Sequence, residues 1–178
     1  MRGSRVARRY ARAMIGLSED HAQLEAWAVE LERLARAVEM PEFQMRLASP
    51  ELSLATRVEV LSRIAERLEL SYPIRSLTTV VARHGRIFDL PAVAESYRDQ
   101  LDILFGRTRA TLTFAREPGP DDTQAVIAGL ERLARKTIIP TIKVDQALLG
   151  GVVAELEGKI YDGSLATRLS EAEHRLLG

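Results

Sequence analysis

The sequence contains no cysteine, so neither a disulfide bond nor thiolate chemistry contributes to this chain. It has no excess of either charge, because 25 basic residues balance 25 acidic ones, and this gives no electrostatic reason to expect a nucleic acid or an anionic membrane as partner. No apolar run approaches the roughly 20 residues that a membrane-spanning helix needs, so we expect no direct membrane insertion. What remains, with 46% hydrophobic and 28% charged residues, is typical of a globular protein.

Basic residues gather at the amino terminus. Several arginines precede the first acidic residue, Glu19. They are Arg2, Arg5, Arg8, Arg9 and Arg12. Contact with nucleic acid or lipid headgroups is one interpretation, but phosphate binding normally uses a clustered basic face with aromatic or polar helpers, and Tyr10 belongs to the apolar side. We expect a solvated arginine face, or one that meets an acidic partner. Helical periodicity from Val6 onwards indicates mature protein rather than a transit peptide.

Apolar residues at helical spacing dominate the first part of the chain. They predict helices over residues 4–17, 21–38, 41–47, 53–68, 71–84 and 89–105. Pro41 suits a first turn, Ser71 a cap, and Gly85 the left-handed position after a last turn. Short polar joints between six helices favour a compact bundle.

The periodicity changes to that of strands after Gly106. Residues 110–114 alternate between apolar and polar side chains, which predicts a strand. Asp121 or Asp122 is then expected to cap a helix, Pro140 to stop the following segment, and residues 142–144 to lie in a second strand. We place a domain boundary at residues 105–109, which gives a helical domain over 1–107 and a small α/β domain over 108–178.

The stretch from residue 149 to 169 predicts a β-hairpin followed by a helix. Residues 152–156 alternate as a half-buried strand, Glu157-Gly158 supplies a two-residue turn, and residues 159–161 return as the partner strand. Asp162, Gly163 and Ser164 form a turn in which Ser164 caps a last helix. That helix carries Leu165, Leu169 and Leu176 on one face. Gly150 and Gly151 indicate a close backbone approach or a bulge beside the hairpin.

The residues that carry chemistry are scattered. His21, His84 and His174 lie far apart, each without a second ligand at metal spacing. No phosphate-binding loop or nucleophile motif is present. The pairs Glu19-Asp20 and Asp121-Asp122 suit helix starts better than acid and base catalysis. We therefore expect no enzyme, and neither a metal nor a cofactor.

Three stretches resemble the delta subunit family of F-type ATP synthases, which includes the mitochondrial oligomycin-sensitivity-conferring protein. Residues 6–13 (VARRYARA) are similar to the family's opening helix, and residues 82–91 (ARHGRIFDLP) to the junction between its fifth and sixth helices. Val144-Asp145, the Leu-Gly-Gly of residues 149–151 and the Tyr-Asp-Gly-Ser of residues 161–164 are similar to its carboxy-terminal signature. Tyr161 departs from the branched aliphatic that the family more often has. The three stretches occur in the family's order across the helical-to-α/β boundary.

The resemblance implies a non-catalytic stator subunit that joins the F1 head to the peripheral stalk and so resists rotation during proton-driven ATP synthesis. It implies that the helical domain binds the amino-terminal helix of an alpha subunit between its first and fifth helices, and that the smaller domain meets the b-type stalk subunits. We expect the groove residues to be Ala7, Tyr10, Ala11, Met14, Leu77, Val80, Val81 and His84. The implied location is the cytoplasmic face of a bacterial plasma membrane, or the matrix or stroma side in an organelle.

Alternatives remain open for the groove and for the function. Met14 and Val81 are either groove residues or simply core residues. An adaptor that binds acidic protein or RNA through the arginine-rich start is a second functional hypothesis, and salt-dependent RNA binding would favour it. A small enzyme with an unrecognised site is a third, and a saturable ligand in the α/β domain would favour that.

Overall fold

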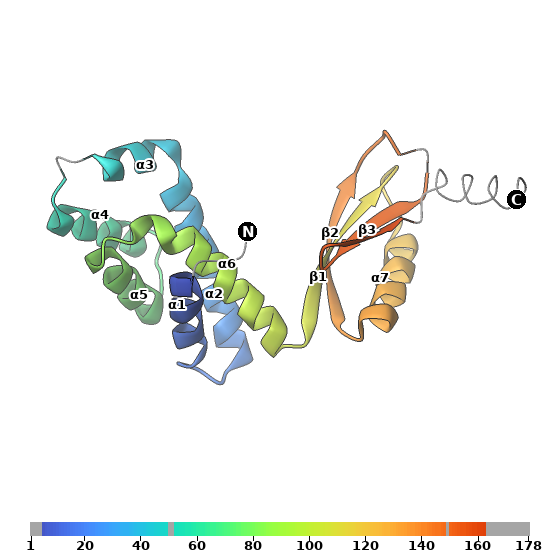
Figure 1. Cartoon of the computed structure of the whole chain (residues 1–178), viewed down its shortest axis with the longest axis horizontal. Helices are drawn as coiled ribbons and strands as arrows, with labels where there is room; N and C mark the ends of the chain where they lie inside the picture. Colours follow the sequence, from blue (N-terminus) through green and yellow to red (C-terminus); the bar gives the residue numbers. More distant parts are fainter. Residues whose placement is uncertain (1–4, 50–51, 149, 163–178) are drawn as a thin grey trace, which may run out of the picture. The chain divides into compact units, whose positions relative to one another are not determined.

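The computed structural model describes residues 5–49, 52–148 and 150–162. The chain forms two compact units that divide between Leu101 and Asp102 (Figure 1). Six helices pack together in the first unit, and the second combines one helix with a four-stranded mixed sheet. The predicted fold class, a helical bundle followed by a small α/β region with a hairpin, is confirmed.

The helices of the first unit begin and end close to the predicted positions. They are α1 (Arg5–Ile15), α2 (His21–Glu39), α3 (Pro41–Ala48), α4 (Leu54–Arg67), α5 (Tyr72–Arg83) and α6 (Leu90–Leu104), with a 3-10 turn, η1 (Ile87–Asp89), before α6. The carboxylate of Asp20 caps α2 by accepting from the Ala22 amide, and the Ser53 hydroxyl caps α4 by accepting from the Thr56 amide. Gly85 has a φ of 68° after α5, as the sequence predicted.

Ser71 precedes α5 as predicted, but its side chain does not cap that helix. Its amide and hydroxyl both donate to the Glu30 carboxylate of α2, at 2.7 and 2.8 Å. A charged acceptor 41 residues away therefore takes the place of the local cap, since hydrogen bonds to an ionised group are the stronger ones. These bonds tie the start of α5 to α2.

The core of the first unit is centred on α2, whose apolar stripe is buried along its whole length. The buried residues of this helix are Leu24, Trp27, Ala28, Leu31, Leu34, Ala35 and Val38. Helix α6 packs against α2 through Tyr97, whose hydroxyl donates to the Leu24 carbonyl at 3.0 Å. The neighbouring Arg98 donates to Glu25 and Glu32 of α2 at 3.0 and 2.8 Å. These contacts fix the position of α6 against α2.

The second unit has a βαβ crossover followed by a hairpin. Its elements are β1 (Arg107–Phe114), α7 (Pro120–Ala134), β2 (Thr137–Val144), β3 (Val152–Leu156) and β4 (Lys159–Asp162). The strand order is β2-β1-β3-β4, with β1 parallel to β2 and antiparallel to β3 (Figure 1). Helix α7 packs on one face of this sheet. The buried residues of this core are Ala110, Leu112, Phe114, Leu130, Ile138, Ala154 and Leu156.

The predicted hairpin is confirmed. Strands β3 and β4 pair antiparallel, and the turn residues Glu157 and Gly158 have φ values of 52° and 77°. Two successive positive φ values give the turn the twist that matches the flanking strands. The Nζ of Lys136 donates to Glu157 at 2.6 Å, and this hydrogen bond holds the pKa of the Glu157 carboxyl below its ordinary value.

Two local predictions for this unit are wrong. Pro140 does not stop a segment, because β2 continues through it, with Pro140 opposite Ala110. The strand tolerates proline because β2 is at the edge of the sheet, where half of the amides face no partner strand. Neither Asp121 nor Asp122 caps α7: Gly119 occupies that position and Pro120 opens the helix, which places both acids in the first turn. There they complement the helix dipole.

Candidate functional site

Helices α1, α2 and α5 enclose an apolar groove of about 640 Å³ on the first unit. The end of α1 and the residues after it form one wall, the first three turns of α5 form the other, and α2 closes the floor. The lining residues are Tyr10, Ala13, Met14, Leu17, Gln23, Trp27, Tyr72, Pro73, Ser76, Leu77 and Val80. Apolar side chains make up most of this surface.

The groove has a buried floor and an exposed apolar rim. Met14 and Trp27 are almost wholly buried, whereas Leu17, Tyr72 and Val80 expose 63%, 76% and 43% of their surface. Large exposed apolar side chains around an apolar hollow mark a surface that a partner can cover. A groove of this shape suits an amphipathic helix better than a flat partner surface.

The structure brings together part of the predicted groove set. Tyr10, Met14, Leu77 and Val80 line the groove. Ala7, Ala11 and Val81 have no exposed surface and belong to the core of the unit. The side chains of the two alanines are buried inside the unit, so their small size does not help a partner helix to approach.

His84 lies just past the end of α5, outside the groove lining. It is exposed, and its Nδ1 lies 2.8 Å from the Val80 carbonyl. That bond satisfies a carbonyl of the last helical turn. The position of this side chain is thus explained by the end of the helix.

Sequence reasoning missed the contribution of α2 to the groove. Trp27 lies on the buried apolar stripe of α2, but part of its side chain also forms the groove floor. No groove role was predicted for Tyr72 or Pro73, the first two residues of α5. A signal was present in the sequence, since helical spacing places Leu17 on one stripe with Tyr10 and Ala13, and all three line the groove.

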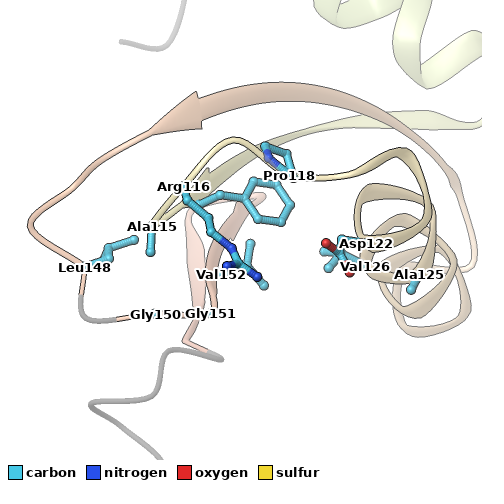
Figure 2. Close-up of a pocket in the computed structure, with 11 residues that line it drawn as sticks. Ala115, Arg116, Pro118, Asp122, Ala125, Val126, Leu148, Gly150, Gly151 and Val152 are labelled. Carbon is cyan, nitrogen blue, oxygen red and sulfur yellow. The ribbon is translucent and has the colours of Figure 1, made fainter.

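The second unit has a pocket of about 710 Å³ at the end of the sheet where β1 stops and β3 begins (Figure 2). Its lining residues are Phe114, Ala115, Arg116, Pro118, Asp122, Ala125, Val126, Leu148, Gly150, Gly151 and Val152. Figure 2 shows the Arg116 side chain reaching toward Val152, with Asp122 on the α7 side of the pocket. The two charges are opposite, so the pocket favours neither an anion nor a cation.

Gly150 and Gly151 form part of this pocket wall, and both have positive φ values, 153° and 83°. The Ala115 amide donates to the Gly151 carbonyl at 3.4 Å, beside the start of the hairpin. Glycine suits these positions because a Cβ would strain such a backbone. Asp162 is the last residue of β4, whereas the predicted turn and cap at Gly163 and Ser164, with the helix after them, lie outside the described residues.

An apolar surface continues from this pocket onto the edge strand. Val144 lies opposite Phe114 in the sheet, and Ile142 lies opposite Leu112. Both share the side of β2 that carries the buried Ile138, because side chains alternate along a strand. Ile142 and Val144 are nevertheless about half exposed, at 48% and 49%. The pocket and these two residues together form the edge surface of the second unit.

Neither surface has the residues of a catalytic centre. Within the described ranges no three side chains of histidine, cysteine, aspartate or glutamate come together in a way that would hold a metal ion. His21 opens α2 and His84 follows the end of α5, while His174 is outside those ranges. A search of the same ranges finds no helix that is both long and apolar enough to cross a bilayer. What the two surfaces offer is apolar contact.

Comparison with known proteins agrees with this architecture. Residues 6–176 match the family model described as ATP synthase delta (OSCP) subunit. The chain is 34% identical over 172 residues to the ATP synthase subunit delta of Anaeromyxobacter dehalogenans, with 96% of each chain covered. It is 28% identical over 177 residues to that of Desulfatibacillum aliphaticivorans, covering 99% of this chain and 97% of the relative.

A solved structure supports the fold. A chain in the cryo-EM structure of the Toxoplasma gondii mitochondrial ATP synthase hexamer matches with a TM-score of 0.64 and 22% identity, covering 98% of this chain and 99% of that chain. From the match of the family model over nearly the full length, the chain belongs to the ATP synthase delta (OSCP) subunit family, and it is a non-catalytic stator subunit of the F-type ATP synthase.

Proposed function

We propose that the groove between α1, α2 and α5 binds the amino-terminal helix of an ATP synthase alpha subunit. The observation that carries this proposal is the apolar floor bordered by exposed apolar side chains, among them Tyr72 and Val80. An amphipathic helix that lays its apolar face on this floor removes both surfaces from water, which contributes roughly 25 cal/mol per Å² of apolar area. Membership in the ATP synthase complex makes another subunit the partner.

The second part of the proposal assigns the edge surface of the second unit to the b-type peripheral stalk subunits. The pocket beside Gly150, with Ile142 and Val144, provides a continuous apolar area. With one partner on each unit, the subunit holds the F1 head to the stalk and resists its rotation. The location that follows is the cytoplasmic face of a bacterial plasma membrane, or the matrix or stroma side in an organelle, and the bacterial relatives favour the former.

Substituting Val80→Asp in the full chain tests the groove. Val80 is partly exposed, so an aspartate there keeps its access to water in the free protein, and we expect the melting temperature to stay within a few degrees. In the complex the carboxylate would lie against the apolar face of the partner helix, and burying it unpaired is costly. We expect the affinity for a synthetic alpha amino-terminal peptide, measured by calorimetry, to fall by at least about tenfold.

Val29→Asp is the matched control. Val29 is 48% exposed on α2, compared with 43% for Val80, and it lies outside the groove lining. The two variants make the same chemical change on a helix of the same unit. If both variants bind the peptide as the parent does, or if both lose binding equally, the groove is not the site.

A further inference from the structure

Both walls of the groove carry positive charge only. Helix α1 has four arginines and no acidic residue, and helix α5 has two arginines and no acidic residue. They are Arg5, Arg8, Arg9, Arg12, Arg75 and Arg83. This bias is local, because the whole chain has equal numbers of basic and acidic residues.

The arginines of these two helices have no ionic partner in the described part of the chain. Some arginines elsewhere do pair: Arg98 with Glu25 and Glu32, and Arg107 with Asp102. Of the acids next to the groove, Asp20 accepts from the Ala22 amide as the cap of α2, and Glu19 precedes it in the α1–α2 connection. Within the described ranges, no acidic side chain forms an ion pair with an arginine of the groove walls.

Two of these arginines lie beside groove residues. The Arg9 guanidinium carbon is 5.8 Å from the ring centroid of Tyr10, which lines the groove. Arg83 follows Val80 by three residues on α5, which places it on the same helix face one turn further along. Arg9 and Arg83 are both exposed, and each belongs to a different wall. Arginine side chains are long and flexible, so these two positions can present a positive charge to a helix in the groove.

From this arrangement we infer that the partner helix carries acidic residues on both flanks of its apolar stripe, and that Arg9 and Arg83 recognise them. This inference rests on the proposed function of the groove and specifies the charge pattern of its partner. The apolar stripe supplies most of the affinity, whereas the acidic flanks supply orientation and selection against basic helices. Exposed ion pairs are individually weak, so the charge effect is moderate and falls with salt.

The test uses the full chain and three synthetic amphipathic peptides of equal length. All three have the same leucine stripe, and they differ only in its flanking residues, which are glutamate, glutamine or lysine. We expect the glutamate peptide to bind about tenfold more tightly than the lysine peptide at low salt, with the glutamine peptide between them. High salt should bring the three affinities together.

Charge reversal assigns the effect to the named residues. In the double variant Arg9→Glu, Arg83→Glu the order of the three peptides should invert, while Arg132→Glu, an exposed arginine on α7 of the second unit, should leave it unchanged. The glutamine peptide has uncharged flanks, so its binding tests the groove proposal separately from the charge inference. If all three peptides bind equally, the charge inference fails and the groove proposal survives; if none binds, both fail.

A preference of the parent for the lysine peptide, or an order that the double variant does not alter, would also overturn the inference. The last measurement is the binding of a single-stranded RNA to the parent and to the Arg9 variant. If the RNA binds in a way that depends on Arg9 while the glutamate peptide does not bind, the basic walls serve a nucleic acid and the inference is wrong.

Discussion

At the scale of single residues, two adjacent side chains of α6 hold it against α2. The Tyr97 hydroxyl is buried and donates to the Leu24 carbonyl, and its burial raises the pKa of Tyr97 above the ordinary value of 10.0. Arg98, the next residue, is only 15% exposed and joins two glutamates. Because the α2 surface that α6 covers is the other side of the helix that forms the groove floor, these contacts keep the floor in place.

Replacing Tyr97 by phenylalanine keeps the ring and removes the hydrogen bond. We expect Tyr97→Phe to lower the free energy of unfolding by about 1 kcal/mol, the usual net contribution of one such bond. Urea unfolding followed by the fluorescence of Trp27, the single tryptophan, measures this change in the first unit. The control is Tyr72→Phe, whose side chain is 76% exposed and whose loss of a hydroxyl should leave stability nearly unchanged.

The stability of the parent and of Tyr97→Phe should also differ in its dependence on pH. Because the pKa of Tyr97 is higher in the folded state than in the unfolded state, the folded protein retains a proton that the unfolded chain releases at alkaline pH. This contribution to stability is complete below the ordinary pKa and is lost as the pH rises above it. The parent should therefore lose stability above about pH 10 more steeply than Tyr97→Phe, and parallel curves would contradict the assignment.

The sequence predicted some of the groove residues but not others. Helical spacing identified the apolar faces of α1 and α5 correctly, and Tyr10, Met14, Leu77 and Val80 do line a groove between these helices. It could not show which apolar face meets a neighbouring helix and which stays open. Ala7, Ala11 and Val81 lie on the face that the rest of the unit covers, and only the packed structure decides that.

At the scale of elements, the turn between β3 and β4 depends on backbone conformation rather than on contacts. Gly158 has a φ of 77°, and a Cβ added there would meet nothing within 4 Å. Gly129 lies inside α7 with equally open surroundings and no positive φ. The same substitution at these two glycines therefore isolates the effect of the backbone.

Gly158→Ala should destabilise the second unit by about 1 kcal/mol, because alanine is strained at positive φ. Gly129→Ala should stabilise the same unit by about 0.5–1 kcal/mol, because glycine inside a helix costs more conformational entropy. Hydrogen exchange of the β3 and β4 amides measures both effects within the full chain. Equal signs for the two variants would show that side-chain contacts govern these positions.

Turns with a strong local cause were predictable from the sequence, and elements decided by sheet position were not. Glu157-Gly158 determines its own turn, so the hairpin followed from the sequence. The continuation of β2 through Pro140 depends on β2 being an edge strand, and the spacing of residues along the sequence does not predict the order of strands in a sheet. Similarly, the Glu30 side chain that replaces the Ser71 cap lies far away in the sequence.

At the scale of the whole molecule, we propose one partner for each compact unit. The groove of the first unit and the edge surface of the second are built from different elements and share no residue. Their lining is mostly apolar in both cases, but only the groove walls carry a uniform charge. A stator needs two independent attachments, and we propose these two surfaces for them.

The most direct measurement of this claim is methyl NMR of the full chain, labelled at methionine, leucine and valine. An alpha amino-terminal peptide and a soluble carboxy-terminal segment of the b-type subunit are added in separate titrations. We predict that the alpha peptide shifts the methyl signals of Met14, Leu17 and Val80, and that the b-type segment shifts those of Val144 and Val152. The account is contradicted if both partners shift the same set of signals, or if the alpha peptide binds without moving those of the groove.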